Sequence, residues 1–325
     1  MSFSKILKMI WNDLDAAIKA NQSFLLSSHL SPDGDAIGSQ LAFYWYLESL
    51  GKNVTIFNQD PIPAKFRFLK YSDLSNLHKP SNKFDIVIVL DCSNPGRLGW
   101  DGVMETAPFI INFDHHRDNT HFGKINIVKT DAAATGELIY QFFVQNKIDF
   151  PPDVAEALYT AIMTDTGGFR FSNTNSRVLR TCADLSDRGA DCARVYDKVY
   201  TSHSAVALTL QAKIWSTLAF YLDNHVCCMN MPLSLLNKLG AQYSDSEGMA
   251  DYTITATGVE VGIMAKHTDN ETHFSLRSRG RIDVGKIAQK VKGGGGHSCA
   301  AGCTIPEPYS QALIKMLKII KKVLD

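Results

Sequence analysis

Neither sign of charge is in excess in this chain. Its 33 lysines and arginines balance 33 aspartates and glutamates among 325 residues. Tight binding of long nucleic acid without sequence preference usually requires a basic surface, so this balance favours a small or short substrate. The seven cysteines include no Cys-x-x-Cys pair, and the adjacent Cys227 and Cys228 are poorly spaced for a disulfide or a zinc site. We therefore expect a reducing compartment, the cytoplasm.

Long hydrophobic runs are also missing, and no apolar stretch reaches the roughly 20 residues that a membrane-spanning helix needs. Residues 3–18 carry Lys5, Lys8, Asp13 and Asp15 at helical intervals, which is typical of an amphipathic surface helix and not of an export signal. With 45% hydrophobic residues, the chain is long enough for two domains with separate cores. We expect no membrane association.

Short apolar runs alternate with helical patterns through the first half of the chain. This alternation predicts an α/β domain over residues 1–190, with a parallel sheet and helices on both faces. The expected strands are residues 24–28, 53–58, 85–90 and 109–113. The expected helices are residues 36–50, 132–146, 152–163 and 177–188.

The pattern of apolar and acidic residues in the sequence changes at about residue 190. Residues 191–223 are mostly helical in pattern and predict a linker. A second, smaller α/β domain is expected over residues 224–325. Its predicted strands are residues 226–231, 258–267 and 271–279, its predicted helices are residues 284–291 and 308–324, and a glycine loop lies at 292–297.

Acidic and histidine residues recur where the apolar segments of the first domain stop. The candidates are His29, Asp33 and Asp35, then Asp91, then Asp114, His115 and His116, and finally Asp165. Such groups are costly to bury, and the carboxyl ends of parallel strands meet at one edge of a sheet. The pattern therefore predicts a metal centre at that edge.

A mixture of imidazole and carboxylate ligands suits Mn²⁺, whereas Mg²⁺ prefers oxygen ligands and zinc more often has thiolates. Two ions about 3.5–4 Å apart can hold the attacking and leaving oxygens of a phosphoryl transfer. A single aspartate such as Asp35 or Asp165 would more often be a helix cap, and a single histidine such as His29 a structural residue. Their recurrence at four successive boundaries favours a two-metal phosphoesterase.

In order along the chain, these residues resemble the four motifs of the DHH phosphoesterase family, which is named for Asp-His-His. The matching segments are His29-x-x-x-Asp33-x-Asp35, Asp91, Asp114-His115-His116 and Asp165-Thr166-Gly167. The resemblance implies one metal on His29, Asp33 and Asp91, and another on Asp35, Asp91, His115 and Asp165, with Asp91 bridging. It also implies that Asp114 orients a histidine and that His116 faces the substrate phosphate or the leaving oxygen.

The second domain contains a run of four glycines that ends at His297, with the basic strand residue Arg277 before it. Glycines allow close approach to backbone N–H groups, and arginine can hold a phosphate with two hydrogen bonds. A flexible turn is the alternative for the glycines, and a solvated face is the alternative for Arg279 and Arg281. Taken with Ser275–Ser278 and Ala300–Gly302, the region is similar to the DHH-associated C-terminal domain of oligoribonucleases. The predicted substrate-binding residues are Arg277, Gly294, Gly295, Gly296 and His297.

This branch of the family implies hydrolysis of short oligoribonucleotides to 5′-mononucleotides and removal of the 3′-phosphate of pAp. The alternatives are a phosphodiesterase acting on pApA or c-di-AMP, a single-strand DNA exonuclease, an inorganic pyrophosphatase and a non-catalytic nucleotide-binding module. The glycine loop argues against the pyrophosphatase, because family II pyrophosphatases share the metal motifs but have a different second lobe. The resemblance also suggests a homodimer.

Overall fold

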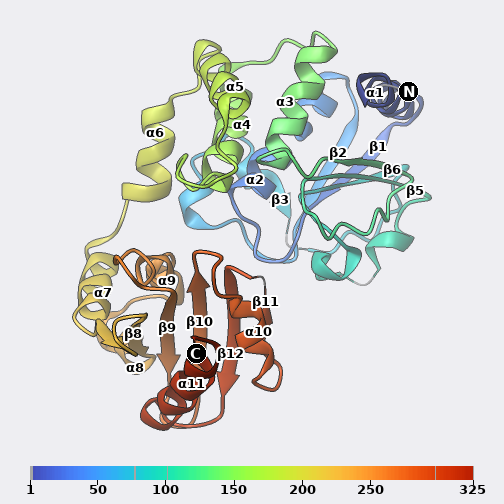
Figure 1. Cartoon of the computed structure of the whole chain (residues 1–325). Helices are drawn as coiled ribbons and strands as arrows, with labels where there is room; N and C mark the ends of the chain where they lie inside the picture. The colour runs from blue at the N-terminus through green and yellow to red at the C-terminus, as the bar shows by residue number, and fades with distance from the viewer. Residues whose placement is uncertain (1–2, 77, 101, 297, 325) are drawn as a thin grey trace. The chain divides into compact units, whose positions relative to one another are not determined.

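A computed structural model of the chain describes residues 3–76, 78–100, 102–296 and 298–324. The chain divides into two compact units, unit 1 (Met1–Ser202) and unit 2 (His203–Asp325), and each is described by itself. Figure 1 shows an α/β arrangement in both.

Unit 1 contains a six-stranded sheet in the order β3-β2-β1-β4-β5-β6, and every neighbouring pair is parallel. The sheet therefore collects the carboxyl ends of its strands at one edge. The strands are β1 (Ser23–Ser27), β2 (Asn53–Phe57), β3 (Ser75–Asn76), β4 (Ile86–Leu90), β5 (Phe109–Asp114) and β6 (Ile125–Val128).

Both faces of this sheet are buried. The helices α1 (Phe3–Ala20), α2 (Gly34–Ser49), α3 (Thr135–Gln145) and α4 (Pro152–Asp165) pack on one face, where Phe24 and Leu26 point. Leu25 points to the other face, which is covered by the 3₁₀ helices η3 (Pro95–Leu98) and η4 (Val103–Glu105). The remaining helices of the unit are η1 (Ala64–Phe66), η2 (Ser72–Leu74), α5 (Ser176–Asp187), α6 (Cys192–Tyr196) and the π-helix η5 (Asp197–Thr201).

Unit 2 contains a mixed sheet in the order β11-β12-β10-β9-β8-β7, in which only β8 and β9 are parallel among the described pairs. Its strands are β7 (Ala219–Tyr221), β8 (Val226–Pro232), β9 (Val261–His267), β10 (Thr272–Ser278), β11 (Gly295–Gly296) and β12 (Ala300–Ile305). Its helices are α7 (Ala205–Trp215), α8 (Ser234–Leu239), η6 (Tyr243–Ser246), α9 (Met249–Tyr252), α10 (Val284–Gln289) and α11 (Tyr309–Leu324).

The two faces of β10 differ in chemistry, because its residues alternate between buried and partly exposed. Phe274 and Leu276 point to a core shared with α10 and α11. His273, Ser275 and Arg277 lie on the opposite face of the strand. On β8 and β9 this opposite face carries a separate apolar cluster with α7 and α9.

The predicted helices and long strands are confirmed, with ends that differ by a few residues. The strands β3, β6, β7, β11 and β12 and the short helices α8 and α9 were not predicted. Among the described residues, no helix is both long and apolar enough to span a membrane.

Candidate metal centre

The predicted ligands gather at the carboxyl edge of the parallel sheet in unit 1. His29 follows β1, Asp91 follows β4, and Asp114 ends β5 directly before His115 and His116. Asp165 is different, because it is the last residue of helix α4. The expectation that every cluster follows a strand is therefore wrong for Asp165, which reaches the site from the helical layer.

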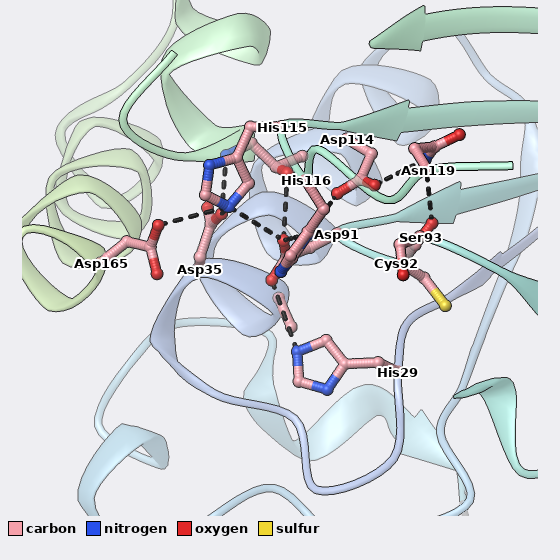
Figure 2. A network of polar contacts seen from close by, with 12 residues as sticks. His29, Asp35, Asp91, Cys92, Ser93, Asp114, His115, His116, Asn119 and Asp165 are labelled. Atoms are coloured by element: carbon pink, nitrogen blue, oxygen red, sulfur yellow. Dashed lines mark hydrogen bonds and ion pairs between the residues drawn. The ribbon is translucent and has the colours of Figure 1, made fainter. Parts of the chain in front are cut away.

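Asp91 lies at the centre of the group (Figure 2). Its Oδ2 is 3.4 Å from Nε2 of His29, and its Oδ1 is 3.6 Å from Nε2 of His115. The side chain is 2% exposed, and the backbone φ of 57° places this residue in the left-handed region. The two oxygens of one carboxylate thus face two different histidines, which is the arrangement required of a bridging ligand.

Two sets of donors extend on either side of Asp91. In the first set, Nε2 of His29 is 3.8 Å from Oδ1 of Asp33. In the second set, Nε2 of His115 is 3.8 Å from Oδ2 of Asp35 and 3.3 Å from Oδ2 of Asp165. The donor atoms of His29, Asp33 and Asp91 lie within 4.8 Å of one another, as do those of Asp35, His115 and Asp165. Each set could hold one metal ion.

The histidine rings are oriented from their other nitrogen. Nδ1 of His29 lies 2.7 Å from the carbonyl oxygen of Leu30, and Nδ1 of His115 lies 3.4 Å from that of Ala132. A backbone carbonyl accepts from an N–H, so Nε2 is the nitrogen left for a metal in both rings. This is the usual way in which a protein fixes a ligand imidazole.

The ring of His116 is oriented by a carboxylate, whereas the rings of His29 and His115 are oriented by backbone carbonyls. Its Nδ1 donates to Oδ1 of Asp114 at 2.6 Å, and Oδ2 of Asp114 accepts from Nδ2 of Asn119 at 2.5 Å. That amide nitrogen also donates to Oδ1 of Asn112 at 2.8 Å. Asp114 is fully buried and is therefore a positioning residue for His116, while Nε2 of His116 is left for a substrate.

Helix capping and metal ligation are combined in this site, and the sequence alone had presented them as alternatives. Oδ1 of Asp33 caps α2 by accepting from the N–H groups of Asp35 and Ala36. Asp35 in turn accepts from the N–H groups of Thr135 (2.6 Å) and Gly136 (2.8 Å) at the start of α3. These bonds fix the direction in which each carboxylate faces.

The electrostatics of the site fit divalent cations. Burial and the negative charge of Asp91 raise the pKa of Asp35 well above its usual value. Burial raises the pKa of Asp165 to about 7, with Asp91 adding to the effect and His115 opposing it. Several carboxylates are thus forced together without enough positive charge, a condition that bound cations relieve.

The histidines respond in the opposite direction. Burial lowers the pKa of His29, but hydrogen bonds and charge from Asp33 and Asp91 outweigh it and raise that pKa to about 10. The hydrogen bond to Asp114 raises the pKa of His116 to about 9. The bond to Asp114 therefore favours the protonated form of the His116 imidazole.

The loop before α3 was not predicted to take part, yet its backbone contacts two members of the second donor set, His115 and Asp35. It supplies the carbonyl of Ala132 to His115 and the N–H groups that hold Asp35. The buried carboxylate of Glu137 accepts from the N–H of Ala133 at 2.8 Å and from Nε of Arg177. Backbone groups leave no pattern in the side chains, so this role could not be predicted from the sequence. For Asn119 the only signal was its place shortly after the Asp-His-His motif.

The predicted substrate residues belong to unit 2. Nε of Arg277 donates to Oδ1 of Asp251 at 2.7 Å, so this guanidinium is paired with a carboxylate of α9. Arg279 donates to the carbonyls of Ile254 and Thr255, and Arg281 donates to Glu260. All three arginines therefore have partners inside the unit.

The glycine loop is more ordered than a flexible turn. Gly295 and Gly296 form β11 and pair with β12, and the N–H of Gly294 donates to the carbonyl of Val291. A Cβ on Gly294 would lie 2.1 Å from the carbonyl oxygen of Ala288, so no larger residue fits there. His297 lies outside the described residues, and its predicted role stays a prediction.

Comparison with known proteins agrees with this division of the chain. The DHH family N-terminal domain matches residues 23–162, and the DHHA1 domain matches residues 225–325. The bifunctional oligoribonuclease and PAP phosphatase NrnA of Thermus thermophilus is 32% identical, over 92% of this chain and 89% of that protein. The protein of the same name from Bacillus subtilis is 25% identical, over 90% and 92%.

A solved structure gives the same result for the fold. An exopolyphosphatase-related protein from Bacteroides fragilis superposes with a TM-score of 0.92 at 25% identity, over 97% of this chain and 96% of that one. With both domain matches in order and a 32% identical relative along nearly its whole length, the chain belongs to the DHH family and carries a C-terminal DHHA1 domain.

Proposed function

We propose that this chain is a metal-dependent phosphoesterase that hydrolyses short oligoribonucleotides to 5′-mononucleotides and removes the 3′-phosphate of pAp. The observation that carries the reaction class is the position of Asp91, whose two carboxylate oxygens face separate donor sets. The substrate class is supported by relatives that are named bifunctional oligoribonuclease and PAP phosphatase and that align over about nine-tenths of their length.

Two divalent cations would be held by this chain, one on His29, Asp33 and Asp91 and one on Asp35, Asp91, His115 and Asp165. We propose Mn²⁺, because each set joins a single imidazole to several carboxylates and no cysteine thiol belongs to either set. When bound, such a pair supplies Lewis acidity, which acidifies a water molecule and offsets negative charge on the phosphate.

The residues around this pair would orient the substrate and move one proton. Asp114 favours the protonated form of His116 and holds its Nδ1, so Nε2–H points away from that pair as a donor. We assign this N–H to the leaving oxygen: as the phosphorus–oxygen bond breaks, the proton passes from Nε2 to that oxygen. The deprotonated imidazole then regains a proton from solvent.

Unit 2 would bind the parts of the substrate other than the reacting phosphate. Arg277 is the proposed phosphate ligand, and a phosphate that binds it competes with Asp251 for the guanidinium. Gly294 and Gly296 pack against the backbone of Ala288 and Ala301, and Gly295 between them, where an added Cβ would meet nothing within 4 Å, would allow a nucleotide to approach the backbone. His297 completes this proposed set.

Two further properties are proposed on indirect grounds. All seven cysteines are free, which supports a reducing, cytoplasmic setting. Family membership supports a homodimer, and sedimentation velocity of the full chain would test it.

The test is a substrate panel with Mn²⁺ added. The panel contains RNAs of two to five nucleotides, pAp, pApA, c-di-AMP, single-stranded DNA and pyrophosphate. We expect the short RNAs and pAp to be the best substrates. Asp91→Ala and the isosteric Asp91→Asn should each lower kcat/KM about a thousandfold or more, because several kcal/mol of charge stabilisation is lost.

Thermal unfolding would verify that both variants are folded, and Arg277→Ala should mainly raise KM. Full activity in Asp91→Asn would exclude the bridging role. A wild-type chain that hydrolyses only pyrophosphate or c-di-AMP would overturn the substrate assignment.

A further inference from the structure

Unit 2 carries a tyrosine whose ring rests on a buried ammonium group. Tyr243, the first residue of η6, is 52% exposed, although Nζ of Lys266 lies only 3.5 Å from its ring centroid. Lys266 itself is 9% exposed. The ring is therefore covered by a cation on one side while more than half of the residue stays open to solvent.

The cation beneath the ring persists at neutral pH. Burial lowers the pKa of Lys266 to about 8, and the negative charge of Glu247 opposes the shift. The ammonium is therefore still largely protonated at pH 7, and a cation–π contact with a desolvated lysine is among the stronger ones. The ring is thus oriented before any ligand binds, so little ordering cost remains for a group that stacks on it.

The register of the sheet relates this ring to the proposed phosphate ligand. Lys266 on β9 pairs with His273 on β10, and Gly262 pairs with Arg277 on the same two strands. His273 and Arg277 are four residues apart on one face of β10, which corresponds to about 13 Å along the strand. A ligand that reaches both places has to extend over that length of strand, which favours an oligonucleotide over a single nucleotide.

The surface between Lys266 and Arg277 carries side chains that suit the binding of a nucleotide. Ser275 lies between His273 and Arg277 on the polar face of β10, and Gly302 and Thr304 of β12 lie opposite them. The ring of His273 lies beside Gly302, where an added Cβ would be 3.6 Å from Cε1, and its Nδ1 contacts Oγ1 of Thr304. Small and polar residues leave this strip uncovered by large apolar side chains, and cationic groups stand at both ends.

Other exposed aromatic residues of unit 2 have a different setting. Tyr252 packs against Trp215 with their ring centroids 5.2 Å apart, which is an apolar pair. Phe220 is 43% exposed on the edge strand β7, and no cation lies over its ring among the described residues. Only Tyr243, among the described aromatic residues of this unit, combines an open ring with an ammonium beneath it.

We propose that Tyr243, supported by Lys266, is a stacking platform for a nucleobase of a bound oligonucleotide, at least one nucleotide away from the phosphate held by Arg277. This inference rests on the proposed function and adds to it a subsite that selects for chain length. Every nucleobase has a π-face, so the platform tolerates any sequence. A substrate such as pAp, which has one base, cannot occupy both places.

The experiment compares Tyr243→Ala, Tyr243→Phe and Phe220→Ala, the last as a matched control that also removes an exposed aromatic ring from unit 2. Binding is measured without added metal, using RNAs of two to four nucleotides in which one base is replaced by fluorescent 2-aminopurine. Stacking quenches this fluorophore, so the quench reports the contact directly. The values of kcat and KM are then measured for pAp and for the same RNAs with Mn²⁺.

We expect Tyr243→Ala to weaken binding of the trinucleotide roughly five- to one-hundred-fold, the usual effect of removing one base–aromatic stack. Its loss in kcat/KM should be larger for the trinucleotide than for pAp and should arise in KM. Tyr243→Phe should retain the quench, and Phe220→Ala should bind all RNAs as the wild type does.

Two outcomes would overturn the inference. One is an unchanged quench and an unchanged trinucleotide KM in Tyr243→Ala. The other is a loss of the same size for pAp and the trinucleotide, which would mean that unit 2 is generally disturbed. Failure of the proposed function is distinguishable from both, because in that case the wild-type chain itself would hydrolyse neither substrate.

Discussion

The amide of Asn119 is the outer member of a hydrogen-bonded chain that ends at His116. It donates to Asp114, which in turn accepts from Nδ1 of His116. Burial alone would raise the pKa of Asp114, but the bonds from His116 and Asn119 hold it below its usual range. Asn119 therefore keeps Asp114 ionised and correctly turned, although it touches no reacting atom.

Replacing Asn119 tests this positioning role. In Asn119→Ala, Oδ2 of Asp114 loses its amide donor, so we expect kcat to fall about ten- to one-hundred-fold with little change in KM. Steady-state kinetics on a dinucleotide and a kcat–pH profile would measure this. Asn126→Ala is the control, because the side-chain hydrogen bonds of Asn126 among the described residues go to Gly123 in the same region. Equal losses in both variants would point to a general effect on the loop.

The residues of the site differ in how well the sequence pattern predicts their roles. The six candidate metal ligands could be singled out from the sequence because carboxylates and imidazoles at the ends of apolar segments are costly unless they are used. Asn119 and Thr135 could not, because asparagine and threonine are ordinary loop residues and their roles depend on which partners the fold brings close. The pairing of Arg277 with Asp251 was hidden for the same reason, since 26 residues separate them in the chain.

At the scale of elements, the start of α3 joins the second donor set, Asp35, His115 and Asp165, to the rest of unit 1. Its first N–H groups hold Asp35, and the preceding loop contacts His115 through Ala132. That loop is fixed from α5, where Arg177 bonds to Glu137 and to the carbonyl of Asp131. Asn173 adds bonds to the carbonyls of Ala133 and Asp165.

Removal of the Arg177 guanidinium should therefore loosen metal binding from a distance. We expect Arg177→Ala to weaken Mn²⁺ affinity about ten- to one-hundred-fold in calorimetric titration, as loss of an outer partner of a ligand does. Excess Mn²⁺ should restore most of kcat. Arg180→Ala is a matched control on the same helix, because the guanidinium of Arg180 is hydrogen-bonded to Ser176 within that helix and to no other side chain among the described residues. If Arg177→Ala lowers the melting temperature but leaves Mn²⁺ affinity unchanged, the residue is structural and does not position ligands.

Elements were predictable in proportion to their length and periodicity. The long helices and the buried strands of unit 1 have strong apolar patterns, and they were found. β7 has three residues, and β12 begins Ala-Ala-Gly, so neither carries the β-branched or aromatic residues that mark strands. Asp165 was grouped with the strand ends because it stops an apolar segment, although residues 152–163 were themselves predicted to form a helix.

At the scale of the whole molecule, the proposed chemistry is divided between two cores. All proposed metal ligands belong to unit 1, and all proposed substrate ligands among the described residues belong to unit 2. Unit 1 continues to Ser202, because Val195 and Val199 are buried in its core. The change in sequence pattern at about residue 190 marks the end of the acidic clusters and not the end of that core.

Unit 2 also contains a buried lysine whose titration should contribute to its stability at alkaline pH. The pKa of Lys266 is lowered by burial to about 8, against an ordinary value of 10.5. Between these values the unfolded chain binds more protons than the folded one, so the free energy of unfolding rises with pH. The rise should be about 1.4 kcal/mol per pH unit above pH 8, and it should be absent below it.

Urea unfolding of the wild type and of Lys266→Met from pH 6.5 to 9.5 would measure this, followed through the transition of unit 2. Methionine has no charge to desolvate, so the difference between the two proteins isolates the lysine from all other titrating groups. We expect the free energy of unfolding of Lys266→Met, relative to that of the wild type, to be highest below pH 8, where burial of the ammonium costs most. Above pH 8, the free energy of unfolding of the wild type should rise steadily relative to that of Lys266→Met. A difference that stays constant across the range would mean that Lys266 is solvated in solution, and the ring of Tyr243 would then lack the fixed cation beneath it.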